Sequence, residues 1–365
     1  MQRQNNICVR QICFMLVSGC AMGKMIVAPA LSAKYADEAL WISSLINFLA
    51  DGAFLLFALW LSEKFDGLTF YEILYGAFGK IFAKIVYFIF FLFFLLKGFI
   101  PLVEQKNYIE IALYETAPSV FTFLGFFLFS SFFCYKGIKS VARCADVTVW
   151  AAAFGIVTLL ALAVPLTDLT ELLPVVGVPI GKILRGAKNT FVWYFDGVYI
   201  LFLIGRFKKE KAYKRKILCS YAVMALITIV YSIILYGEFG AITERQFFSP
   251  IQIGKSNVAL SNIGRIDYVA GFVFAFVCAF NVATPFVFAS YALEVTFDIK
   301  NKLIPVFVVN GTMLLSLLVA HDYFIEVFRF LSAKAIWGYF VVAYAIPLIC
   351  VFAKRSKIRE KISKV

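Results

Sequence analysis

The sequence predicts an all-α polytopic membrane protein, with the whole chain, 1–365, forming one transmembrane domain. Hydrophobic types make up 62% of the residues and charged types only 16%, whereas soluble domains average about 25% charged residues. Mean hydropathy is +0.87. A soluble core cannot take up so much apolar side chain without leaving large exposed patches. The composition therefore excludes a soluble enzyme, a disordered chain and a disulfide scaffold.

Ten segments are long and apolar enough to cross a bilayer, which takes about 20 residues in a helix. In chain order these predicted spans 1 to 10 are 11–33, 40–62, 83–105, 117–135, 147–167, 189–205, 217–240, 266–292, 303–320 and 333–353. The last two leave little room for a connection, at His321-Asp322. The first span has an alternative as a signal peptide, with Ala28-Pro29-Ala30 as the cleavage site. Because Lys24 interrupts the apolar run, we expect a retained span.

The basic residues predict the topology. With the N-terminus inside and the spans alternating, most of the 35 Lys and Arg fall on the cytoplasmic side, as the positive-inside rule requires. Both termini are then cytoplasmic, and 354–365 is a short basic tail. The net charge of +13 also admits a nucleic-acid partner. The clusters at Arg206–Lys211 and Lys354–Lys364 fit topology anchors beside anionic lipid better, so we expect a lipid bilayer and no nucleic acid.

Catalytic and cofactor patterns are absent from the sequence. None of the eight cysteines forms a C-x-x-C pair, and His321 is the only histidine. No zinc, haem or iron–sulfur spacing results, and no nucleophile and base share a helical face. We therefore expect no metal, no cofactor and no enzyme activity.

Glycines and charges predict a break in span 1. Gly19 and Gly23 lie four residues apart, Lys24 lies in the middle of the membrane, and Pro29 follows. In hydrocarbon, unwound backbone is tolerated only where it is buried in protein or lines a cavity. Span 1 is therefore predicted to be discontinuous beside a central site.

Span 6 carries a second predicted break at Asp196-Gly197. If the ten spans are two sets of five, about 11–167 and 189–353, spans 1 and 6 correspond. Corresponding interrupted spans indicate a transporter-like binding site at the repeat interface. The repeat rests on span number and break position, because the two halves show no convincing residue-level similarity.

Paired breaks suit an amino-acid ligand. Half-helix N-termini favour a carboxylate, and freed carbonyls accept hydrogen bonds from an ammonium group. Lys24 and Asp196 add fixed charges near the two breaks. Two interpretations stay open for them: a ligand-contacting or proton-responsive pair, and a structural ion pair that holds the breaks together.

Other polar groups inside the spans are less decisive. Asp51 in span 2 is an alternative partner for Lys24. Lys97 and Glu104 in span 3 share a helical face across Pro101; we expect them to extend toward opposite ends of the membrane, the alternative being that they line a cavity.

Span 8 contains a polar kink at Asn281, Thr284 and Pro285, where we expect Thr284 to satisfy freed backbone rather than a ligand. Phe195 could cover the site at the span 6 break, or could be an ordinary core residue. The candidate ligand-binding residues are Gly19, Gly23, Lys24, Lys97, Phe195, Asp196, Gly197 and Asn281.

Two segments outside the spans also carry predictions. Thr69 and Glu72 form a capping box, which predicts a short helix over about 69–81 on the cytoplasmic side. The connection 241–264 is long, and long ordered loops tend to be functional. It is a candidate lid or subunit contact.

Five motifs resemble the spore-germination permease family, the B subunits of GerA-type germinant receptors, within the amino acid–polyamine–organocation transporter superfamily. They run through nearly the whole chain: Gly23 to Pro29, Leu68-Thr69-Phe70-Tyr71-Glu72 with Gly79-Lys80, Ala142-Arg143-Cys144-Ala145-Asp146, Leu172-Leu173-Pro174-Val175 with Gly177, and Gly264-Arg265-Ile266-Asp267. Phe195-Asp196-Gly197 also resembles the superfamily's helix 6 break, although Tyr199 stands where a Glu is frequent.

The resemblance implies a LeuT-like five-plus-five inverted repeat with broken helices 1 and 6. It also implies a receptor in the inner spore membrane, shared with a larger membrane subunit and a lipoprotein subunit, that binds a small germinant, commonly an amino acid. A second hypothesis is a secondary amino-acid transporter of the cell membrane coupled to H⁺ or Na⁺, because the fold does not choose between the two.

Overall fold

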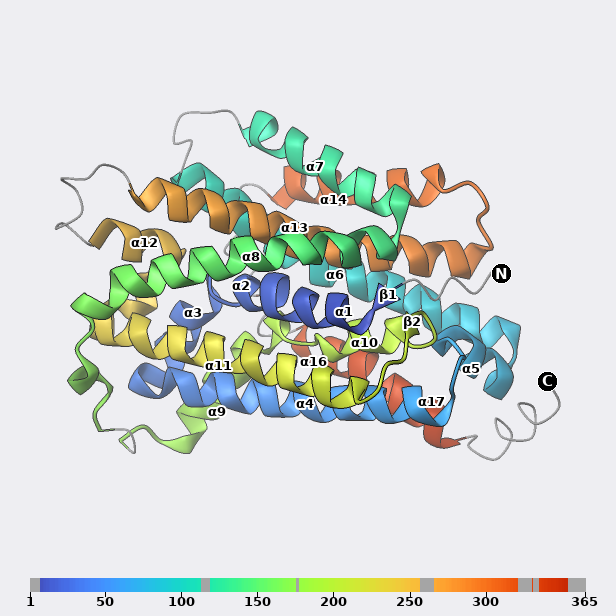
Figure 1. The fold of residues 1–365 in the computed structure, drawn as a ribbon, viewed down its shortest axis with the longest axis horizontal. Coiled ribbons are helices and arrows are strands. Elements are labelled where there is room, and N and C mark those ends of the chain that lie inside the picture. The colour runs from blue at the N-terminus through green and yellow to red at the C-terminus, as the bar shows by residue number, and fades with distance from the viewer. Residues whose placement is uncertain are drawn as a thin grey trace.

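The computed structural model describes residues 7–112, 119–174, 177–256, 266–320, 330 and 335–353. Long helices lie side by side along the longest axis of the molecule, with α1 and α10 in the middle of the bundle (Figure 1). In chain order the main elements are β1 (Ile7–Cys8), α1 (Val9–Met15), η1 (Leu16–Cys20), α2 (Ala21–Gly23), α3 (Ala28–Ala36), α4 (Leu40–Lys64), α5 (Phe70–Phe78), α6 (Lys80–Ala112), α7 (Ser119–Lys136), α8 (Ile138–Ala163), α9 (Ile180–Thr190), η5 (Phe191–Trp193), α10 (Gly197–Leu203), β2 (Phe207–Lys208), α11 (Tyr213–Phe239), η6 (Gly240–Arg245), α12 (Ser249–Ser256), α13 (Ile266–Phe297), α14 (Leu303–Ala320), α16 (Ile336–Phe340), η8 (Val341–Ala345) and α17 (Ile346–Ala353).

The lengths of these helices make the chain an all-α integral membrane protein. Among the described residues, five helical stretches are long and apolar enough to cross a membrane: Ala28–Lys64, Lys80–Glu110, Ile138–Leu166, Tyr213–Arg245 and Gly271–Phe297. Shorter apolar helices run over Val9–Gly23, Leu124–Lys136, Leu303–Val319 and Ile336–Phe352. The all-α membrane class is thus confirmed, while the number of ten spans and the LeuT-like repeat stay predictions.

Span 1 is broken where the sequence predicts. Helix α2 ends at Gly23, residues 24–27 are not helical, and α3 begins at Ala28 with Pro29 in its first turn. Proline has no N–H, so the carbonyl of Met25, four residues earlier, has no donor within the helix. The break therefore leaves a carbonyl in the protein interior that another element must satisfy.

Span 6 is broken as well. Helix α9 tightens into the 3₁₀ turn η5, residues 194–196 are irregular, and α10 begins at Gly197. Phe195 has φ of 58°, a left-handed conformation that is uncommon for a bulky residue. The backbone thus departs from helical geometry at this point, and the N–H groups at the start of α10 have no partner within the helix.

One end of the bundle is built by segments far apart in the chain. Strand β1 pairs in parallel with β2, Ile7 opposite Phe207. The predicted helix near 69–81 is α5, and its capping box is present: the Thr69 backbone N–H donates to Glu72 Oε2 at 2.8 Å and the Glu72 N–H donates to Thr69 Oγ1 at 3.3 Å. The capping box therefore fixes the residue at which α5 begins.

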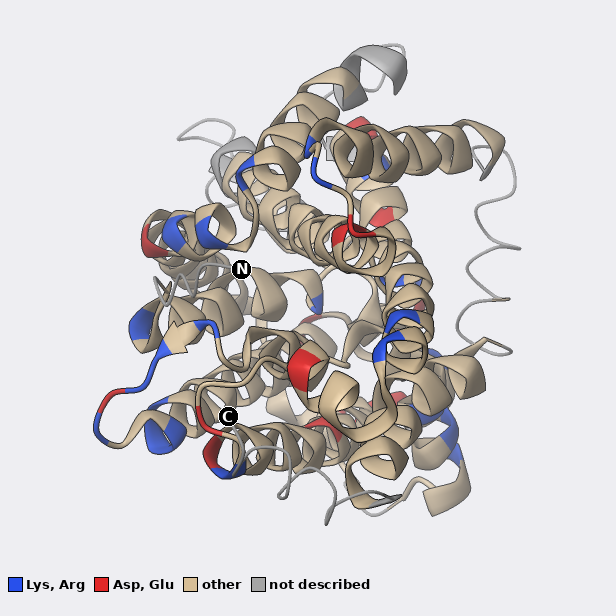
Figure 2. Ribbon diagram, turned by 90° about the vertical axis from the view of Figure 1, so that its right-hand side faces the viewer, with Lys and Arg blue, Asp and Glu red and all other residues tan. Residues whose placement is uncertain are grey.

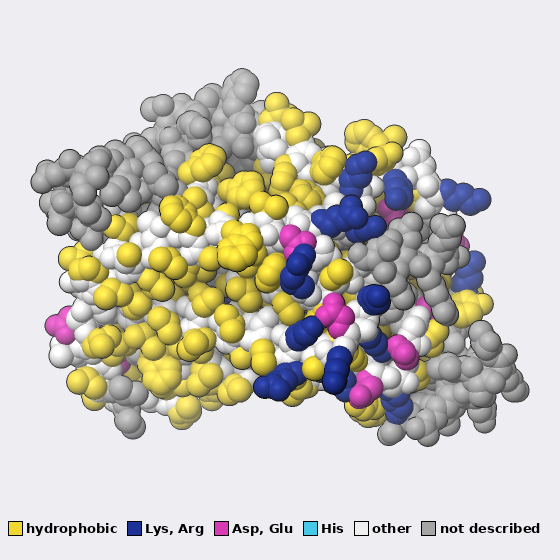
Figure 3. Space-filling model, in the orientation of Figure 1, with side chains coloured by type: hydrophobic (Ala, Val, Ile, Leu, Met, Phe, Trp, Pro, Cys, Tyr) yellow, Lys and Arg dark blue, Asp and Glu magenta, His cyan; other side chains and the backbone are white. Residues whose placement is uncertain are grey.

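Charge gathers at this same end. In Figure 3, Lys and Arg lie over the end that carries β2 and α5, and hydrophobic side chains cover most of the remaining visible face. Figure 2 views the bundle from that end, with charged residues around it. Asp298 follows the last residue of α13. Its Oδ2 accepts a hydrogen bond from Lys84 Nζ at 2.7 Å and lies 3.3 Å from Lys80 Nζ. These hydrogen bonds lower the pKa of Asp298.

Candidate functional site

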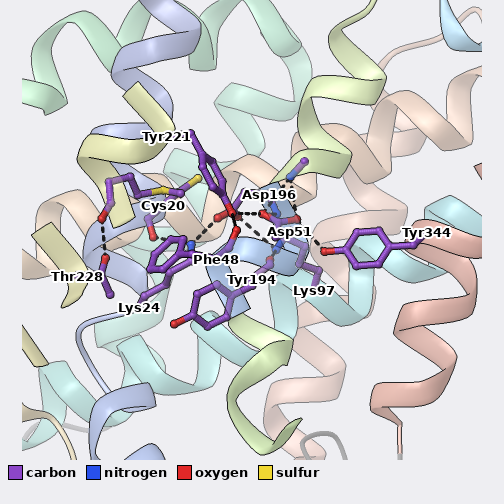
Figure 4. A network of polar contacts seen from close by, with 12 residues as sticks. Cys20, Lys24, Phe48, Asp51, Lys97, Tyr194, Asp196, Tyr221, Thr228 and Tyr344 are labelled. Carbon is purple, nitrogen blue, oxygen red and sulfur yellow. Dashed lines mark hydrogen bonds and ion pairs between the residues drawn. The ribbon is translucent and has the colours of Figure 1, made fainter. Parts of the chain in front are cut away.

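The two helix breaks meet at an ion pair. Lys24 Nζ, in the break of span 1, contacts Asp196 Oδ2, in the break of span 6, and also donates to the carbonyl of Cys20 at 2.9 Å. Both side chains are buried, with exposed fractions of 2% and 3%. The pair lies near the centre of the polar network in Figure 4. Residues 172 positions apart in the chain are therefore joined in the protein interior.

Lys97 of α6 supplies a second ammonium group. Its Nζ donates to the carbonyl of Tyr194, which the span 6 break has freed, and lies 3.5 Å from Asp196 Oδ1. It also lies 5.1 Å from the centre of the Tyr199 ring. The expectation that Lys97 extends toward a membrane surface is wrong, because a carboxylate and a free carbonyl hold it in the centre.

Asp51 of α4 binds the backbone of the span 6 break. Its carboxylate accepts the N–H groups of Asp196 and Gly197 at 3.1 and 3.2 Å, and the hydroxyls of Tyr221 and Tyr344 at 3.0 and 2.7 Å. A negative charge is favourable at the N-terminus of a helix such as α10. Lys24 pairs with Asp196, so the alternative pairing of Lys24 with Asp51 is wrong.

A small cavity adjoins these charges. It measures about 20 Å³, which is room for a single water molecule. The residues that line it are Cys20, Gly23, Lys24, Lys97, Ile100, Pro101, Val192, Trp193, Asp196, Tyr199 and Asn281. Spans 1, 3, 6 and 8 thus all contribute to it, and five of the predicted site residues meet there.

The other three candidates lie beside the cavity without lining it. A β-carbon on Gly19 would lie 3.1 Å from the ring of Phe280, and one on Gly197 would lie 2.9 Å from the ring of Phe54. Phe195 is fully buried and stacks on Tyr339, with ring centroids 5.7 Å apart. Their role in ligand binding stays a prediction, and their observed role is close packing around the breaks.

Glu104 and Thr284 have other partners. Glu104 is fully buried and accepts the indole N–H of Trp193 at 2.7 Å. The expectation that it extends to the membrane surface is therefore wrong. Thr284 donates to the carbonyl of Phe280 at 2.9 Å, so it binds backbone as predicted, although the carbonyl that Pro285 frees is that of Asn281.

Sequence reasoning missed several residues of the site. Cys20, Trp193 and Tyr199 line the cavity, and Tyr221 and Tyr344 hold Asp51. The chain has 18 tyrosines and five tryptophans, and no sequence pattern distinguishes the ones at the site. Cys20 had one usable signal, since it is next to Gly19 in the predicted break.

Within the part of the chain that the structure describes, no group of three or more His, Cys, Asp or Glu side chains could hold a metal ion. The charges at the breaks are instead balanced by two lysines and two aspartates of the protein itself.

The fold and the site together describe a membrane helix bundle in which two broken helices are joined by a buried ion pair beside a small cavity. The chain matches the spore permease family model, described as spore germination protein, over residues 6–325. It therefore belongs to the spore germination protein family, as the motifs indicate. Comparison with curated proteins gives no match.

Proposed function

We propose that this protein is the membrane subunit of a spore germinant receptor, which binds a small germinant, an amino acid, between the two helix breaks. The observation that carries the proposal is the buried pair of Lys24 and Asp196 beside the cavity. Family membership supports a role in germination, and it favours a receptor or transporter over an enzyme.

The pair suggests how an amino acid enters. Removing one partner of a buried pair leaves an uncompensated charge, which costs about 3–5 kcal/mol. A zwitterion avoids this cost because it brings both charges: its carboxylate replaces Asp196 beside Lys24, and its ammonium group replaces Lys24 beside Asp196. Since the cavity holds about one water in its present size, this exchange requires the breaks to move apart.

Movement of the breaks is the proposed signal. The Asp196 backbone N–H is bonded to Asp51, and Asp51 is bonded to Tyr221 of α11 and Tyr344 of η8. A ligand that separates Lys24 from Asp196 therefore also moves α11 and η8, because Asp51 connects them to the break in span 6. A receptor needs only a ligand that binds one of two states more tightly.

The proposed architecture is the LeuT-like repeat of five plus five spans, with both termini in the cytoplasm. The position of the two breaks supports the repeat, and the basic end with β2 and α5 supports the orientation. The larger membrane subunit, the lipoprotein subunit and the inner spore membrane follow from the family and are proposed with the receptor.

A second candidate is a secondary amino-acid transporter. It is favoured by one observation: span 1 is held at two places, at its start by Asp146 of α8 through Gln11 at 2.9 Å and at its break by Ser249 of α12, which donates to the carbonyl of Met25 at 2.9 Å. Two separate closures are what alternating access needs. The coupling ion of this candidate is H⁺ or Na⁺.

One experiment tests both candidates. The purified chain in liposomes is assayed for binding and for uptake of a labelled amino-acid panel, with and without a proton gradient. Saturable binding that is lost in Asp196→Asn and retained in Asp298→Asn, a carboxylate at the charged end, supports the ligand site. Binding without uptake supports the receptor, uptake supports the transporter, and no binding to the wild type refutes the site.

A further inference from the structure

The hydroxyl of Ser249, in the connection between α11 and α13, donates a hydrogen bond to a carbonyl in the break of span 1. Ser249, the first residue of α12, donates from Oγ to the carbonyl of Met25 at 2.9 Å, and its backbone N–H donates to the carbonyl of Ile26 at 3.3 Å. Met25 is the residue whose helical donor Pro29 has removed. Ser249 thus supplies the hydrogen bond that the break lacks.

The hydrogen bond between Ser249 and Met25 is buried, and neighbouring residues fix its direction. Ser249 has no exposed surface, and its Oγ accepts the hydroxyl of Tyr231 on α11 at 2.8 Å. Since that hydroxyl proton occupies one side of Oγ, the Ser249 proton is directed toward Met25. Phe248, just before it, is held at φ of 63° and packs edge-on against Tyr108, which fixes the approach of α12.

The described residues that precede Ser249 in this connection also contact span 1. The turn η6 packs against α3, and α12 lies at the end of the bundle away from β1 and β2 (Figure 1). At the opposite end, Asp146 of α8 accepts Gln11 at 2.9 Å and lies 3.2 Å from Arg10. Each side of the cavity therefore has its own polar contact on span 1.

We propose that Ser249 is a positioning residue that latches the α12 end of the cavity shut, with Tyr231 orienting it. The inference rests on the proposed ligand site, because it assigns the route by which a ligand reaches the breaks. While the bonds to Met25 and Ile26 are intact, α12 holds the break closed. When these two hydrogen bonds are lost, the cavity opens toward the α12 end of the bundle. Asp146 controls opening toward the end that carries β1 and β2.

Cys20 is a built-in reporter of opening, because it lines the cavity and its side chain is 4% exposed. The full-length chain is treated with a membrane-impermeant methanethiosulfonate in spheroplasts and in inverted vesicles, and modification of Cys20 is quantified by mass spectrometry. Cys20→Ser is the blank. No ligand is needed, so failure of the latch is distinguishable from failure of amino-acid binding.

Ser249→Ala is expected to raise the Cys20 modification rate at least fivefold in only one of the two preparations. Asp146→Asn is expected to raise it in the other one. Ser249→Thr keeps the hydroxyl and is expected to stay within twofold of wild type. If Ser249→Ala does not accumulate, Tyr231→Phe replaces it, with an expected threefold rise on the same side. An unchanged rate, or an equal rise in both preparations, overturns the proposal.

Discussion

The side-chain amide of Asn281 lies directly against Gly23, so that a β-carbon at position 23 would come within 2.0 Å of Asn281 Nδ2. Helix α13 thus touches span 1 at the residue before Lys24. Close approach of this kind needs a glycine, and it places the amide at the wall of the cavity. The contact explains why the break in span 1 carries a glycine at this position.

Gly23→Ala is expected to weaken amino-acid binding about 5- to 150-fold, because overpacking a tight contact costs about 1–3 kcal/mol and displaces Asn281 from the cavity wall. Equilibrium binding to the purified protein measures the effect. Gly311→Ala is the control, since nothing lies within 4 Å of a β-carbon there. The double variant Gly23→Ala with Asn281→Ala should be more stable to unfolding than Gly23→Ala alone. If it is not, the clash with Asn281 is not the cause of the loss in Gly23→Ala.

Neutralising one partner of the central pair is expected to destabilise more than neutralising both. Asp196→Asn leaves Lys24 and Lys97 without their shared carboxylate, which should cost about 3–5 kcal/mol. Lys24→Gln should cost less, because Lys97 still lies 3.5 Å from Asp196.

The double variant Lys24→Gln with Asp196→Asn keeps the net charge of the cluster and should be more stable than Asp196→Asn alone. Thermal unfolding in detergent checks the order. Asp298→Asn, at an exposed ion pair, should leave the melting temperature unchanged. Equal losses in the two single variants and the double variant would contradict the pairing.

Asp51 is expected to matter for stability more than any single tyrosine that binds it. Asp51→Ala leaves the N–H groups of Asp196 and Gly197 buried without an acceptor, and each such group costs about 1–3 kcal/mol. Tyr344→Phe removes one hydrogen bond to a charged acceptor, worth about 1.5–3 kcal/mol. Chemical denaturation of the three variants Asp51→Ala, Tyr221→Phe and Tyr344→Phe ranks them, and a smaller loss for Asp51→Ala would refute its role at α10.

Gly205→Ala is expected to destabilise the end of the bundle with α5. Gly205 has φ of 73°, and a β-carbon there would lie 2.6 Å from the carbonyl of Leu68. Gly137→Ala is a matched control, because Gly137 has φ of 78° with nothing within 4 Å and tests backbone strain alone. Strain of this kind costs about 1 kcal/mol, so the melting temperature should fall further in Gly205→Ala than in Gly137→Ala. Equal losses would mean that the Leu68 contact adds nothing.

The sequence by itself determined the fold class, the two breaks and the start of α5. These follow from local chemistry: apolar length sets membrane helices, Gly and Pro interrupt them, and Thr69 with Glu72 caps a helix. It also indicated that Lys24 and Asp196 lie near each other, since two broken spans were expected to face one central site. The motifs also indicated the family, because each motif is a short run of neighbouring residues and their order along the chain is visible in the sequence.

Only the tertiary structure decided which charges pair and which hydroxyl binds the break in span 1. Lys97 could be expected at the membrane surface from its own helix, but the carbonyl of Tyr194 and the carboxylate of Asp196 draw it inward. Ser249 and Met25 are 224 residues apart, and no periodicity relates them. Such contacts depend on the packing of whole helices, in which a buried polar group takes whichever partner the fold brings within reach.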